Sequence, residues 1–187
     1  MFILYAVAIG ILIGYIRGGR LKYLTLHPLK KHGLAIGGFI IQIILFSGIP
    51  FLSALPRTIS LGFHIISYIL LLFFIVLNRK ITGIPVIGTG IFSNALAITL
   101  NGGYMPAYVS SLESTSMGKY SESVTQGVNN SIAISDSTKL PWLCDVFHLP
   151  EWLPFSNVFS IGDVIIAVGV CIYLVVNMQS PKKKAPG

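Results

Sequence analysis

Five apolar stretches separated by polar segments dominate the chain. They run over residues 1–16, 33–55, 59–77, 83–100 and 159–176. A helix needs about 20 apolar residues, with a range of about 17–25, to cross the hydrocarbon core of a bilayer. The pattern therefore predicts five transmembrane helices, of which the second and third form a tight hairpin because only three residues separate them.

The composition strengthens this prediction. Of 187 residues, 53% are hydrophobic and only 10% are charged, whereas a soluble domain carries roughly 25% charged residues. This difference excludes an ordinary soluble enzyme, a disordered tail and a nucleic-acid-binding module. The sequence thus predicts one all-α membrane domain over residues 1–187.

The basic residues predict the orientation of the five spans. Ten of the thirteen Lys and Arg residues fall in the alternate segments that face one side of the membrane. Because Lys and Arg are enriched in cytoplasmic loops, that side, with the flexible basic tail 178–187, is expected in the cytoplasm and the N-terminus outside. All six acidic residues lie on the outer side or at its membrane edge. The net charge of +7 therefore records topology rather than an acidic partner.

The first cytoplasmic loop alternates basic residues with leucine and tyrosine. Such a segment is typical of chain that lies in the headgroup layer, where its cations attract anionic lipid. A docking surface for a protein partner is the alternative interpretation. The residues expected to contact lipid or partner are Arg17, Arg20, Lys22, Lys30 and Lys31.

The outer loop over residues 101–158 is too long to be a simple connector. Its part from 110 to 137 is rich in Ser, Thr, Asn and Gly, which predicts a mobile segment or a small polar cap. The part from 140 to 155 is apolar and carries Trp142 and Trp152. Prolines divide it into short pieces, and Trp favours the membrane–water boundary. We expect short interfacial helices over the mouth of the bundle.

Polar side chains inside the spans share one depth. Four of them fall in the outer half of the predicted membrane: His64, Asn94, Asn101 and Asp163. Ionisable groups in a span are costly and often functional, so the pattern predicts a ligand pocket that opens to the outer leaflet under Trp142 and Trp152. The alternative is structural. His64 and Asn94 would then hydrogen-bond to neighbouring helices, and Asp163 would lie in a first helical turn capped by Ser160 or Asn157.

Catalytic and cofactor motifs are mostly missing from the sequence. It has no HExxH, CxxC or Walker motif, and the single His within a span does not suit a haem held by two His ligands. No metal or cofactor is predicted. One catalytic arrangement remains, because Asp145 and Asp163 can both lie at the outer interface and share a proton, as in aspartic proteolysis. Bacterial lipoprotein signal peptidases place such a pair at this depth in a similarly small bundle, although their surrounding motifs are not matched here.

Two segments resemble the hallmark regions of an uncharacterised family of small bacterial polytopic membrane proteins, known as a domain of unknown function. They run from Asn94 to Tyr108, with NGGYMP at 101–106, and from Leu140 to Gly169, with FSIGDVIIAVG at 159–169. The resemblance covers the C-terminal half, and Cys144 stands where a glycine is expected. It implies five spans in a bacterial cytoplasmic membrane and brings no activity with it. The matching positions are Asn101, Gly102, Gly103, Met105, Pro106, Asp145, Ser160, Gly162 and Asp163.

These observations predict a membrane protein without an evident catalytic motif. It would be an accessory subunit of a membrane complex, or a binder of an apolar or amphipathic molecule such as a lipid or quinone in the outer pocket. The expected partners are membrane lipids and a membrane protein, not nucleic acid. A transport component is one alternative, and an intramembrane aspartyl hydrolase that uses Asp145 and Asp163 is another.

Overall fold

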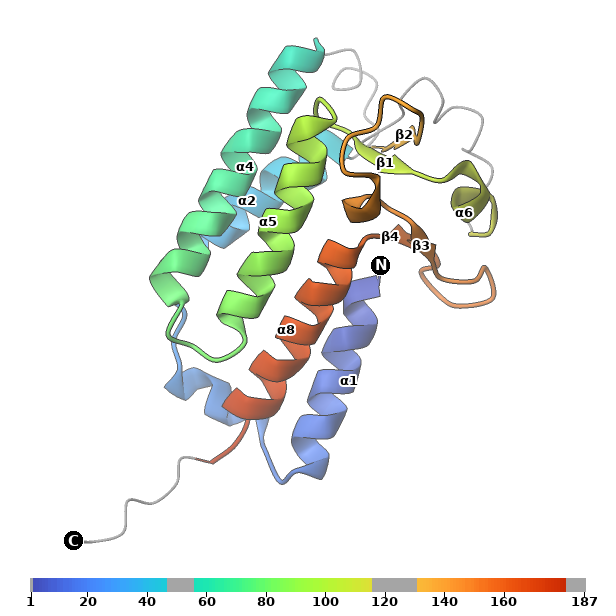
Figure 1. The fold of residues 1–187 in the computed structure, drawn as a ribbon. Coiled ribbons are helices and arrows are strands. Elements are labelled where there is room, and N and C mark those ends of the chain that lie inside the picture. Colours follow the sequence, from blue (N-terminus) through green and yellow to red (C-terminus); the bar gives the residue numbers. More distant parts are fainter. Residues whose placement is uncertain (1, 47–55, 116–130, 181–187) are drawn as a thin grey trace, which may run out of the picture.

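Five long helices form most of the described part of the protein (Figure 1). The computed structural model describes residues 2–46, 56–115 and 131–180. The helices lie within a few residues of the predicted stretches, so the mainly helical fold is confirmed. Positions 47–55 of the second stretch and 181–187 of the tail lie outside the described residues. The long helices are α1 (Phe2–Ile16), α2 (His32–Phe46), α4 (Arg57–Asn78), α5 (Ile84–Leu100) and α8 (Ile161–Asn177).

The lengths of these helices differ in their fit to a bilayer. In the described part of the chain, one helix, Thr58–Asn78, is long and apolar enough to cross a membrane. The other four are apolar but have only 10–17 residues. The five-span topology therefore stays a prediction.

The long helices form a curved row. Contacts between neighbours run in the order α2, α4, α5, α8, α1, and side chains from all five line one cavity. We call the end of the row that carries Asn101 and Ser160 the strand end, and the end that carries Asn78 and Asn177 the tail end. Helix α1 begins toward the strand end, and α8 runs from the strand end to the tail end (Figure 1).

Glycines allow α5 and α8 to approach closely in the middle of the row. A Cβ atom added at Gly90 would lie 2.5 Å from the carbonyl oxygen of Gly162. A Cβ atom added at Gly169 would lie 2.6 Å from the backbone nitrogen of Ile87, and one at Gly162 would overlap the amide of Asn94. Small residues permit this backbone contact between apolar helices. The close approach brings polar groups of α5 and α8 within hydrogen-bonding reach.

Three asparagines at helix C-termini fasten the connecting segments to the row. Each side chain donates to the carbonyl four residues earlier in its own helix and also bonds a distant backbone segment. Asn78 bonds the N–H and C=O of Lys30 at 2.7 and 3.0 Å. Asn177 donates to the carbonyl of Thr82 at 3.1 Å. Asn101 bonds the N–H and C=O of Lys139, both at 2.9 Å.

The segment between α5 and α8 contains short strands as well as short helices. Strand β1 (Met105–Ala107) pairs in parallel with β2 (Ser131–Ala133), and β3 (Phe147–His148) pairs antiparallel with β4 (Val158–Phe159). The short helices there are α6 (Val109–Glu113) and the 3-10 helix η3 (Pro141–Leu143), and a further 3-10 helix, η1 (Leu21–Leu26), lies at the tail end.

Of the short helices predicted over residues 140–155, the described structure has one, the 3-10 helix η3, and the interfacial location stays a prediction. Beyond η3, the backbone N–H of Leu149 bonds the carbonyl of Asn157 at 3.0 Å and closes a hairpin. Pro150 and Pro154, within that hairpin, are incompatible with a helix interior. Of the predicted polar segment 110–137, residues 116–130 lie outside the described part, and α6 and β2 flank them.

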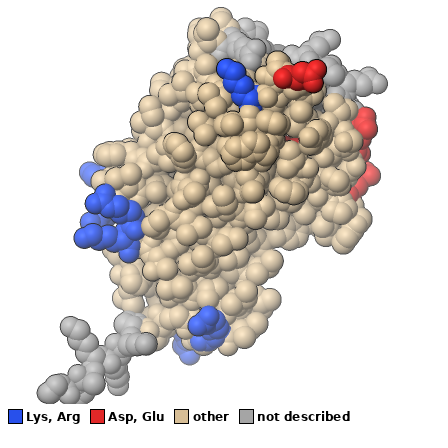
Figure 2. Space-filling view, in the orientation of Figure 1, with Lys and Arg blue, Asp and Glu red and all other residues tan. Residues whose placement is uncertain are grey.

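The charged residues of the described part gather at the two ends (Figure 2). Arg17, Arg20, Lys22, Lys30 and Lys31 are all exposed at the tail end. Exposed acidic residues lie toward the strand end, among them Asp136 and Glu151. Between the ends, the visible face is a broad band without charge (Figure 2).

Candidate functional site

A cavity of about 440 Å³ lies within the curve of the helix row. All five long helices and the segment before α2 contribute to its wall. Most of the lining side chains are aliphatic or aromatic, and five carry a polar group. The lining residues are Ile3, Leu29, Ala35, Phe39, Gln42, Tyr68, Leu71, Phe74, Ile75, Ile84, Ile87, Ile91, Asn94, Asp163, Ile166, Val170 and Tyr173.

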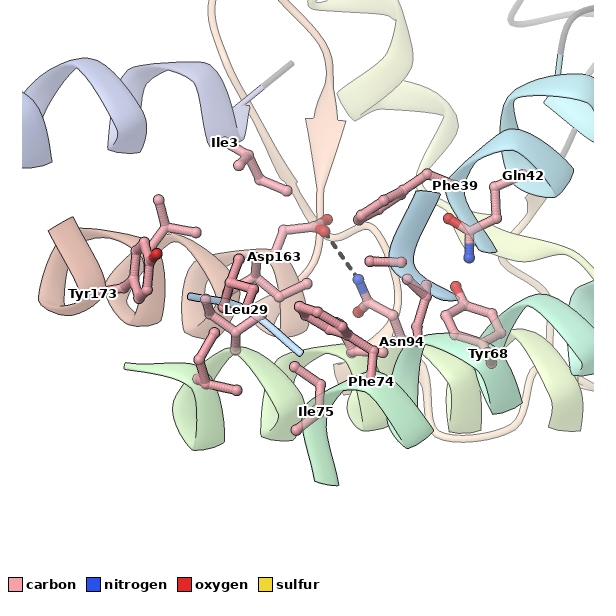
Figure 3. Close-up of a pocket in the computed structure, with 17 residues that line it drawn as sticks. Ile3, Leu29, Phe39, Gln42, Tyr68, Phe74, Ile75, Asn94, Asp163 and Tyr173 are labelled. Carbon is pink, nitrogen blue, oxygen red and sulfur yellow. Dashed lines mark hydrogen bonds between the residues drawn. The ribbon is translucent and has the colours of Figure 1, made fainter. Parts of the chain in front are cut away.

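Polarity changes along the cavity. Asn94 lies near the end of α5, and Asp163 lies in the first turn of α8, so both are close to the strand end. Gln42 and Tyr68 lie to one side of this pair and Tyr173 to the other (Figure 3). Toward the tail end, the walls are apolar except for Tyr173. From Asp163 to Tyr173 the helix rises about 15 Å at 1.5 Å per residue. The cavity therefore has a polar end and a long apolar body.

Asp163 is held by a ring of hydrogen bonds at the start of α8. Its backbone N–H donates to Oγ of Ser160 at 3.1 Å, and its Oδ2 accepts from the backbone N–H of Ser160 at 3.0 Å. This reciprocal pair is a capping box. Nδ2 of Asn94 donates to Oδ1 of Asp163 at 2.9 Å (Figure 3). Oγ of Ser160 lies 2.8 Å from Oδ1 of Asn94 and 3.0 Å from Oδ2 of Asp163, so its one proton goes to either acceptor.

The groups of this ring that point to the side chain of Asp163 are hydrogen-bond donors. Such N–H and O–H donors suit an ion that only accepts hydrogen bonds. The N-terminus of α8 also carries a partial positive charge that stabilises a carboxylate in the first turn. Among the described residues that line the cavity, Asp163 is the one with a charge.

A second carboxyl group, that of Asp145, lies near Asp163. Its backbone N–H donates to the carbonyl of Pro106 at 2.9 Å, and η3, just before it, contacts both α5 and α8. Burial, and then the negative charge of Asp163, raise the pKa of Asp145 well above its ordinary value. Burial, and then the charge of Asp145, raise the pKa of the neighbouring Cys144 thiol to about 11. The two carboxyl groups thus have contrasting environments. That of Asp163 is rich in hydrogen-bond donors, and that of Asp145 disfavours the charged form.

The structure brings two of the six predicted pocket residues to the cavity, Asn94 and Asp163. His64 is 2% exposed but is absent from the lining. Asn101 instead fastens Lys139 to the end of α5. Trp142 and Trp152 are 63% and 79% exposed, and neither lines the cavity as a roof.

Sequence reasoning missed Tyr68 and the apolar body of the cavity. Tyr68 follows His64 by four residues on α4 and so lies one turn further along the same side of that helix, which is a signal that could have found it. The apolar lining carries no sequence signal, because its residues look like those of any buried helix face. In the part of the chain that the structure describes, no three His, Cys, Asp or Glu side chains come together to hold a metal ion.

Comparisons with known proteins match the region of the chain that forms most of the cavity wall. A family model described as a family of unknown function (DUF5317) matches residues 26–175, which include the cavity wall except Ile3. An uncharacterized protein of Thermotoga maritima is 26% identical over 128 residues, which cover 65% of this chain and 68% of the relative. No solved structure matches the chain.

Proposed function

The chain belongs to the DUF5317 family of unknown function, and we propose that it is an integral membrane protein that binds an amphipathic molecule between its five long helices. The observation that carries the proposal is the cavity, polar near the strand end and apolar toward the tail end. In this proposal the five helices cross a bacterial cytoplasmic membrane, with the strand end outside.

The outward faces of the helices support a membrane location. Large apolar side chains on all five are between 50% and 67% exposed: Leu12, Ile43, Ile69, Phe92 and Val168. Soluble monomers rarely expose apolar patches above a few hundred Å². In lipid the same faces are solvated. Helices of 15–17 residues are about 22–26 Å long, shorter than the roughly 30 Å hydrocarbon core, and a locally thinner bilayer accommodates them.

The charges at the two ends support the orientation and the lipid contacts. Arg17, Arg20, Lys22, Lys30 and Lys31 are exposed at the tail end, where they would meet anionic headgroups at about 1 kcal/mol each. The exposed Trp142 and Trp152 suit the opposite interface.

Reporter fusions test this topology. Green fluorescent protein fused after Gly187 should fluoresce, and alkaline phosphatase fused after Asp136 should be active outside. The reverse pattern would overturn the orientation. Extraction of the unfused protein by alkaline carbonate would overturn membrane integration.

The size and lining of the cavity support a small amphipathic ligand. Ligand pockets in proteins have volumes of about 300–1,000 Å³ and are mainly apolar with a few placed polar groups. The cavity has 440 Å³ and this composition. A polar head near Asn94 and Asp163, with an apolar chain along Ile87 and Ile166, matches the distribution of polarity.

A matched pair of substitutions on α8 tests binding. Ile166 lines the cavity, whereas Val168 on the same helix is 50% exposed and faces away from it. Ile166→Trp should fill the cavity and reduce the lipid or quinone that co-purifies in mild detergent, as measured by mass spectrometry of an organic extract. Val168→Trp should leave the amount unchanged. Equal ligand content in both variants would reject the cavity as the binding site, and co-purification of a stoichiometric protein would favour an accessory subunit.

A second candidate function is hydrolysis by Asp145 and Asp163, with the cavity holding the apolar part of an ester or amide substrate. The observation that favours it is the contrast between the two carboxyl groups. Pairs of carboxyl groups in contrasting environments can divide the roles of general acid and general base. Asp163 would accept a proton from water as the water oxygen bonds to the substrate carbonyl carbon, and Asp145 would donate its proton to the carbonyl oxygen. The tetrahedral intermediate would then return that proton to Asp145 as its C–O or C–N bond breaks, and Asp163 would pass its proton to the leaving alcohol or amine.

Replacement of each aspartate by asparagine, its isosteric amide, tests the proposed hydrolase activity. A lauroyl amide of a fluorescent aminocoumarin is the probe, because cleavage releases fluorescence. Asp145→Asn and Asp163→Asn should each abolish the release, and Asp136→Asn, an exposed acidic residue of the same end, should not. Release that all three variants retain would end this candidate.

A further inference from the structure

We propose that the cavity selects its ligand by the charge of the headgroup, and that it takes amphipathic molecules with a cationic or hydrogen-bond-donating head and rejects those with an anionic head. This inference rests on the proposed ligand-binding function and specifies the chemical class of the ligand.

The first argument for this selection is the distribution of charge around the cavity. Asp163 is the charged residue of the described lining, and it lies at the polar end. No Lys or Arg is among the described residues that line the cavity. Lys30 and Lys80 are exposed at the tail end, and Lys139 is exposed at the strand end, outside the cavity lining. An anionic head at the polar end would therefore meet a carboxylate in surroundings of low dielectric, where like charges repel more strongly than in water.

The second argument is that the carboxylate of Asp163 can accept more hydrogen bonds than its neighbours donate. A carboxylate offers about four acceptor positions. Asn94 and the backbone N–H of Ser160 supply two donors to Asp163, and the proton of the Ser160 hydroxyl is shared with Asn94. Acceptor capacity of Asp163 thus remains for a donor on the ligand. An ammonium or hydroxyl head supplies such a donor, and a carboxylate head cannot.

The two ends of the protein then sort amphipathic molecules by charge. Anionic headgroups are attracted to the exposed basic residues of the tail end, outside the cavity. A cationic head is attracted to Asp163 at the strand end, and its chain follows the apolar wall of Ile91, Ile87 and Ile84 along α5. Charge alone would keep abundant anionic lipid from occupying the cavity.

Three probes with the same alkyl chain test this inference: dodecylamine, dodecanol and laurate. Each is added to the detergent-purified full chain, and native mass spectrometry measures the fraction of protein that carries it. We expect dodecylamine to bind about 10- to 100-fold more tightly than laurate, the factor that a charge-assisted hydrogen bond supplies, with dodecanol between them. Asp163→Asn should reduce the ratio of amine to laurate binding to near one and keep dodecanol binding.

The cavity-filling variant separates this inference from the proposed function. Ile166→Trp should lower binding of all probes relative to Val168→Trp. If both tryptophan variants bind alike, the cavity is not the site and the proposed function fails. If Ile166→Trp blocks binding but the original chain binds laurate as tightly as dodecylamine, ligand binding stands and the charge selection is overturned. If Asp163→Asn does not fold, the amine-to-laurate ratio of the original chain alone decides.

Discussion

The side-chain amide of Asn94 donates a 2.9 Å hydrogen bond to the carboxylate of Asp163, 69 positions later in the chain. Oδ1 of the same amide lies 2.8 Å from the hydroxyl oxygen of Ser160, the N-cap of α8. Asn94 therefore extends the capping box of one helix onto its neighbour. This contact joins α5 to α8 and forms the polar end of the cavity.

Replacement of Asn94 should show how much this contact contributes to the stability of the fold. Asn94→Leu keeps the side-chain size but removes the donor to Asp163 and the acceptor for Ser160. A partly buried carboxylate without its donor costs about 1–3 kcal/mol, so we expect a lower midpoint of thermal unfolding in detergent. Ser93→Ala is the matched control, since no hydrogen bond of the Ser93 hydroxyl is seen within the described residues. Equal unfolding midpoints for the two variants would contradict the stabilising role of Asn94.

A methyl group at Gly162 should force α5 and α8 apart. Its Cβ would overlap the amide of Asn94, and overpacking of this kind costs about 1–3 kcal/mol. Gly162→Ala should therefore lower the unfolding midpoint and weaken ligand binding. Gly62→Ala is the control, because no atom lies within 4 Å of a Cβ added there, and alanine in a helix is favoured over glycine by about 0.5–1 kcal/mol. Destabilisation by both substitutions alike would show that the close approach is not the cause.

The link between Asn101 and Lys139 should hold the strand-bearing segment on α5. Asn101→Ala removes three hydrogen bonds, which predicts a loss of about 1–3 kcal/mol in the free energy of unfolding. Asn101→Asp keeps the acceptor for the N–H of Lys139 but loses the amide donor, so its loss should be intermediate. Limited proteolysis at residues 134–140 would measure local release. Unchanged cleavage in Asn101→Ala would count against this role.

The raised pKa of Asp145 predicts a specific pH dependence of stability. Its folded-state pKa lies well above its ordinary value, so the folded state binds the proton more tightly than the unfolded state does. This group then stabilises the fold most at low pH, and its contribution is lost as the pH rises from about 3.9 through the folded-state pKa. Asp145→Asn mimics the protonated acid, so its stability relative to the original chain should increase with pH.

Thermal unfolding of both chains between acidic and alkaline pH measures this difference. Asp136→Asn is the control, because Asp136 is exposed and its stability difference should stay flat. A constant difference between Asp145→Asn and the original chain at all pH values would contradict a raised pKa at Asp145.

Titration of the Cys144 thiol offers an independent probe of the negative charge on Asp145. In a Cys171→Ala background, thiolate absorbance should titrate with a pKa of about 11. Asp145→Asn removes the negative charge that contributes to this value, so the pKa should fall. It should stay above the ordinary thiol value because burial, the larger cause, remains. An unchanged titration would place Asp145 too far from Cys144 to influence it.

Sequence reasoning located the helices well because apolar length is a local property. The stretch 59–77 lies within α4, and the stretch 159–176 corresponds to α8 to within two residues at its start. It did less well over residues 140–155, where an apolar composition suggested helices throughout. There the pairing of β3 with β4 depends on backbone hydrogen bonds between residues 147–148 and 158–159, which periodicity over so few residues cannot reveal.

For the site, the sequence identified the common depth of Asn94 and Asp163 but not which polar groups meet. Depth follows from position along a helix, at 1.5 Å per residue. Rotation of one helix against another follows from packing, and the glycines at 90, 162 and 169 set the contact of α5 with α8. The packing of α5 against α8 turns Asn94 toward Asp163, and His64, which belongs to α4, is absent from the cavity wall.

By itself, the amino-acid sequence determined, to within a few residues, where the long apolar helices of the described residues lie, and the separation of positive from negative charge along the chain. Both depend on the order of residues and on local chemistry. Only the tertiary structure decided that the five helices curve around a cavity with one carboxylate at its polar end. It also placed Asp145 near that carboxylate. Contacts between segments far apart in sequence depend on how closely two backbones can approach, and the glycines at 90, 162 and 169 allow that approach between α5 and α8.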